Sequence, residues 1–109
     1  MPTEISVQDL KRRLDAKETV TLLDVRDDWE TKLARLPHSA HIPVTEIEHR
    51  LDELDPNDEI IVYCHHGIRS LDATAYFAGH GLQNVRSMRG GIDAWSCEID
   101  PNLPRYELA

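Results

Sequence analysis

Ile60-Ile61-Val62-Tyr63, followed directly by Cys64-His65-His66-Gly67-Ile68-Arg69-Ser70, is the stretch of sequence that determines the expected fold. Its first four residues form a continuous apolar, largely β-branched run, which is typical of a buried strand. A glycine-containing loop follows, and then a helix is expected from about Arg69 to His80, with Gly81 as its stop. A buried strand, a loop and a helix in this order are the parts of an α/β unit.

Strand and helix patterns alternate on both sides of this unit. Ser6 can cap a first helix, with Asp9 three residues on as a capping partner. This alternation predicts an α/β fold in which a central, mainly parallel sheet is flanked by helices on both faces. The length of 109 residues suits one domain over residues 1–109. The other expected elements are strands over 20–25 and 85–88, short helices from Asp27 and over 45–54, a turn at 55–58, and a last helix opened by Gly90-Gly91 that contains Trp95.

Two further features of side-chain placement are expected. The helix from about Arg69 to His80 carries Leu71, Ala75 and Ala78 on one face. The only cysteines, Cys64 and Cys97, are interpreted as reduced thiols because a chain of this length can build a core without a disulfide. Cys97 is expected to be buried, with a resolving-cysteine role as the alternative.

Composition and charge exclude some classes of partner. The net charge of −8 argues against binding nucleic acid or an anionic membrane, since both require clustered Lys and Arg. No window approaches the ~20 apolar residues of a membrane-spanning helix. The first ten residues lack the basic start and apolar centre of a secretory signal, so a cytoplasmic location is expected.

The loop after residues 60–63 contains the expected chemistry. Sites in parallel sheets gather at the carboxyl ends of strands, where residues 24–26 and Cys64 are both expected. The Cys64 thiol would face the positive end of a helix and unpaired backbone amides, which favours the thiolate. Gly67 lets the loop curl around an anion, Arg69 adds a guanidinium, and His65 and His66 are expected to add partial positive charge. The predicted site is therefore locally positive in an acidic protein.

The remaining polar residues near this loop have simpler interpretations. Asp24 and Arg26 follow a buried strand, so we expect them to form a structural network with each other, with Glu30 or with the loop. Ser70 is expected to bond to the helix start. Neighbouring Cys and His residues on a tight loop cannot easily aim three donors at one ion, so no metal is expected.

Four motifs in order resemble the rhodanese family over nearly the whole chain. Residues 22–26 (LLDVR) resemble its first strand, residues 36–43 (LPHSAHIP) its I-P-G-A-x-x-I-P segment, residues 63–70 (YCHHGIRS) its active-site loop of the C-x-x-G-x-R type, and residues 90–95 (GGIDAW) its G-G-x-x-A-W element. The chain departs from the family where His38 and Ser39 replace the usual Gly-Ala.

The resemblance implies a single-domain thiosulfate sulfurtransferase without a metal or organic cofactor. Cys64 would be the catalytic residue that takes sulfur from a small anionic donor such as thiosulfate. The persulfide would then transfer sulfur to cyanide in an assay, or to a thiol or protein in the cell. Residues 65–69, His65, His66, Gly67, Ile68 and Arg69, would bind the substrate, and Asp24, Arg26 and Ser70 would support the site.

Two alternatives belong to other classes. Cysteine-dependent phosphatases and arsenate reductases also use a Cys-to-Arg loop, but theirs has five intervening residues and this one has four, His65 to Ile68. A non-enzymatic interaction module on the same fold would be expected to lack the loop cysteine, and Cys64 is present. A thioredoxin-like oxidoreductase is disfavoured because no C-x-x-C occurs. The donor and acceptor are left open.

Overall fold

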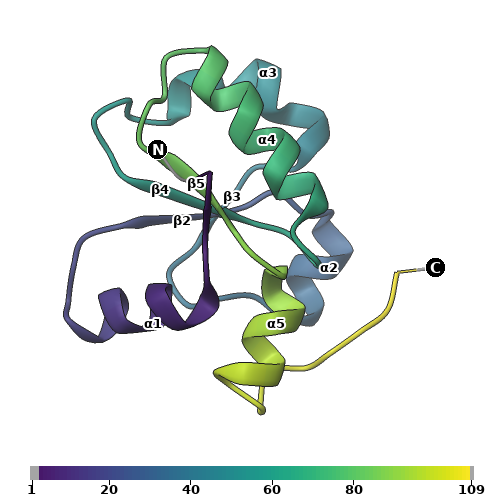
Figure 1. Cartoon of the computed structure of the whole chain (residues 1–109). Helices are drawn as coiled ribbons and strands as arrows, with labels where there is room; N and C mark the ends of the chain where they lie inside the picture. The colour runs from purple at the N-terminus through teal and green to yellow at the C-terminus, as the bar shows by residue number, and fades with distance from the viewer. Residues whose placement is uncertain (1–2, 109) are drawn as a thin grey trace.

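The computed structural model describes residues 3–108 and shows a five-stranded sheet (Figure 1). The ends of the predicted 1–109 domain, Met1, Pro2 and Ala109, lie outside the described residues. All the strand pairs found among residues 3–108 are parallel, and the strand order is β1-β5-β4-β2-β3. The strands are β1 (Glu4–Ile5), β2 (Thr21–Asp24), β3 (Ala40–His41), β4 (Ile60–Tyr63) and β5 (Val85–Met88).

In the described part of the chain, four α-helices connect the strands and a fifth follows β5. They are α1 (Val7–Asp15), α2 (Asp28–Leu33), α3 (Ile47–Arg50), α4 (Ile68–Gly79) and α5 (Gly91–Glu98). The single helix expected over 45–54 is instead α3 flanked by two 3₁₀ turns, Val44–Glu46 and Leu51–Glu53. The predicted caps are present: Ser6 Oγ accepts a hydrogen bond of 3.1 Å from Asp9 N, and Asp27 forms a capping box with Glu30. No helix in the described part of the chain is long and apolar enough to cross a membrane.

Helices cover both faces of the sheet, as Figure 1 shows, so the predicted fold class is confirmed. The side chains of β4 alternate between the faces because successive residues of a strand point to opposite sides. On one face Val62 packs with Phe77 of α4 and Ile47 of α3. On the other face, Ile61 of β4 packs in one cluster with Leu10 of α1 and with Ile92 and Trp95 of α5.

The predicted apolar face of α4 does not face the core. Leu71, Ala75 and Ala78 are exposed, and the buried residues are instead Ser70, Ala73, Thr74 and Phe77. Ser70 and Thr74 tolerate burial because their hydroxyls are satisfied: Thr74 Oγ1 donates to Ser70 O at 2.7 Å, and Ser70 Oγ lies 2.7 Å from Ser87 Oγ. The buried face of α4 was not predicted because two of its four residues, Ser70 and Thr74, are polar, and the prediction rested on apolar periodicity.

Candidate active site

Residues 24–26 and Cys64 lie at the carboxyl ends of their strands, as predicted, and these strands, β2 and β4, are neighbours in the sheet. Asp24 is the register partner of Tyr63, and Val25 N donates to Tyr63 O at 3.1 Å. Cys64 follows Tyr63 directly, so the segment after β2 and the Cys64 loop meet at one edge of the sheet.

The Cys64 thiol lies inside the start of α4. The residue is 1% exposed, and its Sγ accepts hydrogen bonds from Gly67 N at 3.1 Å and Ser70 N at 3.3 Å. Ser70 Oγ lies 3.4 Å from the sulfur, and Ser70 Oγ is held in turn by Ser87 of β5. Two amides and the positive end of a helix therefore surround the sulfur, which favours a negative charge there. Ser87 was not singled out from the sequence, although it is one of two polar residues in β5.

Gly67 gives the loop its curl. Its φ of +100° belongs to the left-handed region, which glycine adopts without steric cost. A Cβ at this position would also lie 3.2 Å from Gly90 N and 3.4 Å from Met88 O. The turn of the loop is thus packed closely against the connection between β5 and α5.

The start of α5 fixes the backbone of the loop. Ile92 N donates to Cys64 O at 2.8 Å, and Asp93 N donates to His65 O at 3.1 Å. These are helix-start amides that have no partner within α5, so the loop carbonyls satisfy them. At Gly91 a Cβ would lie 2.3 Å from His65 O and 2.5 Å from Cys64 O, so only glycine fits.

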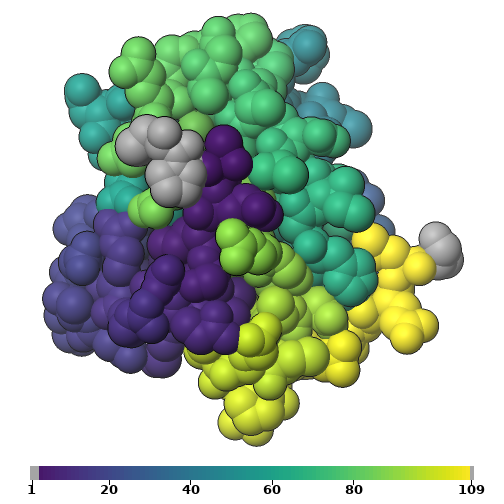
Figure 2. All heavy atoms as spheres, viewed as in Figure 1, coloured from purple at the N-terminus to yellow at the C-terminus, as the bar shows by residue number. Residues whose placement is uncertain are grey.

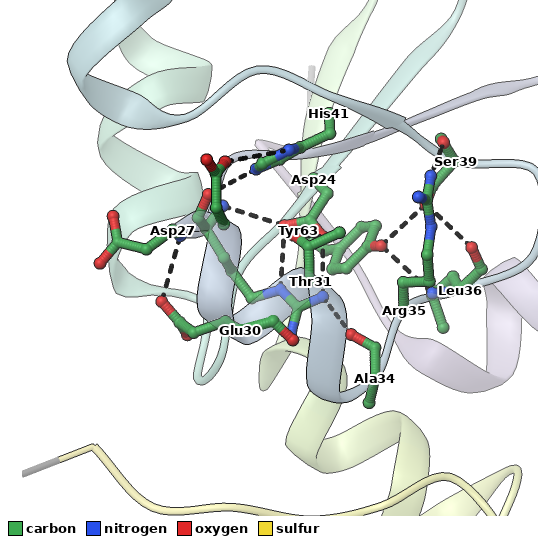
Figure 3. Close-up of polar contacts among 12 residues, drawn as sticks. Asp24, Asp27, Glu30, Thr31, Ala34, Arg35, Leu36, Ser39, His41 and Tyr63 are labelled. Atoms are coloured by element: carbon green, nitrogen blue, oxygen red, sulfur yellow. Dashed lines mark hydrogen bonds and ion pairs between the residues drawn. The ribbon is translucent and has the colours of Figure 1, made fainter.

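A buried ion pair follows β2. Arg26 and Asp24 are both 0% exposed, and Arg26 donates to Asp24 through Nε at 2.9 Å and through Nη2 at 2.7 Å. Arg26 Nη2 also donates to Ala34 O at 2.6 Å, and Thr31 Oγ1 donates to Asp24 at 2.9 Å. Figure 3 shows Asp24, Thr31 and Ala34 in this network. Such complete satisfaction is what allows two charges to be buried.

Arg69, on the first turn of α4, forms a second pair with Glu30 of α2. Its terminal nitrogens donate to the two Glu30 oxygens at 2.7 and 2.8 Å. Burial on its own would raise the pKa of Glu30, but hydrogen bonds from Arg69, Tyr106 and the Asp27 backbone outweigh it and lower that pKa to about 2. Both terminal nitrogens of Arg69 are therefore engaged by a carboxylate before any ligand arrives.

The two histidines of the loop differ in exposure. His65 is 1% exposed, and burial, reinforced by the neighbouring His66, lowers its pKa below the ordinary value of 6.5. Burial therefore favours the neutral imidazole of His65, which gives no support to the expectation that this residue adds positive charge. The His66 side chain is 57% exposed. Ile68 is 74% exposed, so its side chain projects away from the buried sulfur.

Sequence reasoning missed Tyr106 altogether. Its hydroxyl donates to Glu30 Oε2 at 2.6 Å and accepts from Arg26 Nη1 at 2.9 Å. It lies in an irregular, proline-containing tail, where no periodicity signals a contact with residues some 76 positions earlier.

Cys97 was expected to be buried and is exposed. The helix α5 buries Gly91, Ile92, Trp95 and Ser96, which form one helical stripe, and this leaves Cys97 on the outer side. Both cysteines are free thiols. Over residues 3–108, no group of three or more Cys, His, Asp or Glu side chains is arranged to hold a metal ion.

Comparison with known proteins gives a consistent set of relatives. The family model for the rhodanese-like domain matches residues 6–98. The chain is 38% identical over 93 residues to YrkF of Bacillus subtilis, of which it spans about half, 50%. It is 34% identical to a protein named sulfurtransferase from Allochromatium vinosum, with 88% of this chain and 90% of that protein covered. It is 32% identical to the thiosulfate sulfurtransferase GlpE of Pseudoalteromonas translucida, with 93% and 95% covered.

A solved structure shows the same fold. The crystal structure of a rhodanese-like domain protein from Staphylococcus aureus superimposes with a TM-score of 0.83 at 28% sequence identity, covering 98% of this chain and 100% of that one.

Proposed function

Because this chain belongs to the rhodanese-like domain family, we propose that it is a sulfurtransferase that carries sulfane sulfur as a persulfide on Cys64. The observation that carries the proposal is the setting of the thiol. Cys64 Sγ is buried at a helix start and accepts two backbone hydrogen bonds, from Gly67 N and Ser70 N. The names of the relatives from Allochromatium vinosum and Pseudoalteromonas translucida agree with this chemistry.

The proposed reaction has two steps. The Cys64 thiolate attacks the outer sulfur of a donor such as thiosulfate; an S–S bond forms on Cys64, the S–S bond of the donor breaks, and sulfite leaves with the electron pair. An acceptor nucleophile then attacks the outer sulfur of the persulfide, which restores the Cys64 thiolate. The acceptor is cyanide in an assay and a thiol or a protein in the cell.

The loop would stabilise the anionic states of both steps. Gly67 N and Ser70 N already point at the sulfur, and the other amides between His65 and Arg69 lie on the same turn. Hydrogen-bond donors that are fixed in advance stabilise a developing charge without reorganisation, and in many enzymes this effect lowers the barrier more than any other. Ile92 N and Asp93 N contribute by holding the peptide groups of Cys64 and His65 in this orientation.

The length of the loop favours sulfur over phosphate. Four residues separate Cys64 from Arg69, one fewer than in cysteine-dependent phosphatases, and Arg69 is paired with Glu30. A shorter turn whose guanidinium is already neutralised is better matched to one sulfur atom than to a tetrahedral dianion.

The test is the intact mass of the protein after incubation with thiosulfate. The wild-type chain should gain one sulfur atom, which cyanide should remove. Cys64→Ser should gain none, whereas Cys97→Ser should behave as the wild type and serve as the matched control. Equal labelling of the two variants, or turnover of an aryl phosphate by the wild type at the rate of a phosphatase, would show that the site has been misassigned.

A further inference from the structure

The segment after α5, residues 100–108, returns to the Cys64 loop. Figure 2 shows this yellow segment against the teal start of α4. It contains no helix or strand, and it is attached to α5 by an ion pair between Arg105 and Asp93 of 2.9 Å. The match to the family model ends at residue 98, so this segment lies outside the matched region.

The hydroxyl of Tyr106 joins the two ion pairs of the site, the buried Arg26–Asp24 pair and the partly buried Arg69–Glu30 pair. It accepts from Arg26 of the first pair at 2.9 Å and donates to Glu30 of the second at 2.6 Å. The Arg26–Asp24 pair is anchored on β2, and the Glu30–Arg69 pair ends on the first turn of α4. The hydroxyl therefore connects the strand end to the helix that follows Cys64.

The ring of Tyr106 packs against the loop itself. Its centroid lies 4.2 Å from that of His65, the residue after Cys64, and 5.7 Å from that of Trp29 in an edge-on contact. Among the described residues, His65 Nδ1 is buried without a hydrogen-bond partner. The position of the His65 ring therefore depends on packing, and the Tyr106 ring packs against it.

We propose that Tyr106 is a positioning residue for the Cys64 loop and that the C-terminal segment is a working part of the site, an inference that rests on the sulfur-transfer function proposed above. Tyr106 acts through Glu30 on Arg69 and through its ring on His65. Tyr106 lies in residues 100–108, far from the loop in the sequence. It can therefore position the loop only when this segment is packed against it.

Removing the hydroxyl alone leaves both ion pairs short of a partner. Glu30 Oε2 would keep only Arg69 Nη2, and Arg26 Nη1 would keep only a weak contact of 3.4 Å with Glu30 O. Buried charged groups that lose a hydrogen bond reorient or draw in water because their desolvation is no longer offset. The guanidinium of Arg69 should then be less well fixed at the entrance to the loop.

The experiment compares Tyr106→Phe and Tyr106→Ala with Tyr76→Phe, each made in the whole 109-residue chain. Tyr76 is half-buried on α4 and stacks on His80, and its hydroxyl makes none of the contacts with Arg26 and Glu30 that Tyr106 makes. In Tyr106→Phe, kcat/KM for thiosulfate should fall roughly tenfold, mainly through KM, as expected for one charge-assisted hydrogen bond. Tyr106→Ala should lose more, because the ring contact with His65 is lost as well, and Phe should restore that part.

Hydrogen exchange of the peptide 64–70 is the second readout and needs no sulfur transfer. It should be several times faster in Tyr106→Phe and unchanged in Tyr76→Phe, because only the former loosens the loop. Unchanged exchange overturns the proposal, and so does faster exchange with a wild-type KM in an active enzyme. If the wild type forms no Cys64 persulfide, the proposed function fails, while the exchange data still decide whether Tyr106 positions the loop.

Discussion

Replacing Gly91 by alanine tests whether the start of α5 supports the Cys64 loop. A Cβ at this position would lie 2.3 Å from His65 O and 2.5 Å from Cys64 O, and both contacts are with backbone atoms that cannot swing aside. The loop must therefore move, which breaks the hydrogen bonds from Ile92 N and Asp93 N. The left-handed φ of +65° adds strain to any residue with a side chain.

The expected cost can be assembled from these parts. Each lost backbone hydrogen bond contributes about 1 kcal/mol and the left-handed alanine about 1–2 kcal/mol, so Gly91→Ala should lower the free energy of unfolding by about 3–4 kcal/mol. Because the displaced peptide groups are those of Cys64 and His65, sulfur transfer should also fall by at least roughly tenfold in the fraction that remains folded.

Two other glycines supply matched controls. Gly81 has a φ of +97°, but a Cβ added there would meet no atom within 4 Å, so Gly81→Ala should cost only the conformational part, about 1–2 kcal/mol, and leave activity intact. Gly79 lies in α4 with open space around it, so Gly79→Ala should stabilise by about 0.5–1 kcal/mol. Urea unfolding and steady-state sulfur transfer measure all three. If Gly91→Ala is no worse than Gly81→Ala in both assays, α5 does not support the loop.

Two further predictions concern the pair formed by Arg69 and Glu30. Arg69→Ala should lower kcat/KM for thiosulfate by a factor equivalent to about 1.5–3 kcal/mol, because it leaves the buried Glu30 carboxylate beside the loop without its partner. Arg69→Lys should recover only part of this loss, because a point charge cannot replace the two-pronged contact with Glu30. Full activity of Arg69→Ala in steady-state assays contradicts this prediction. The folded-state pKa of Glu30 is about 2 against an ordinary 4.5, so its stabilising contribution is present above pH 4.5 and is lost as the pH falls toward 2. Between pH 4.5 and 2, the free energy of unfolding of the wild type should therefore fall relative to that of Glu30→Gln. If the difference between the two free energies stays constant with pH, the assignment is refuted.

The strongest local patterns in the sequence predicted the centre of the molecule. The β-branched run of β4 and the glycine after Cys64 act through neighbouring residues, so the strand, the curl at Gly67 and the following helix could all be deduced. The edge strands β1 and β3 were missed because each has two residues, too few to show a period. These short strands form because each hydrogen-bonds to a longer neighbour, β1 to β5 and β3 to β2.

The parts of the site that were missed are held by distant contacts. Glu30 and Arg69 are 39 positions apart, and Glu30 and Tyr106 are 76 apart. No spacing rule links such residues before the fold is known. The buried face of α4 was predicted wrongly for a related reason. Ser70 is buried because Ser87 of β5 satisfies its hydroxyl, and that partner is also remote in the sequence.

His38 adopts a backbone conformation that glycine favours, although it is not a glycine. It stands where the family often has glycine, and its φ of +62° is in the left-handed region that glycine favours. Ser39 next to it is buried, with Oγ donating to Leu36 O at 2.8 Å and lying 3.0 Å from Tyr63 Oη. The turn is thus held by contacts of the second residue, which lets the first one be a histidine.

The negative net charge of the chain would not prevent the Cys64 loop from binding the proposed anionic donor, because the two fields act over different distances. The field of the exposed charges that contribute to the net charge of −8 is screened by salt beyond a Debye length of about 8 Å. At the sulfur, Gly67 N and Ser70 N lie 3.1 and 3.3 Å away, and Cys64 is 1% exposed, so their dipoles are less screened than charges on the surface. Arg69 adds little net charge there because Glu30 neutralises it, and His65 adds none while it is neutral. In the proposed reaction, the loop would therefore bind the anionic sulfur chiefly through its backbone amides. That binding would depend on the elements that hold the backbone in place: the start of α5 and, as we propose, Tyr106.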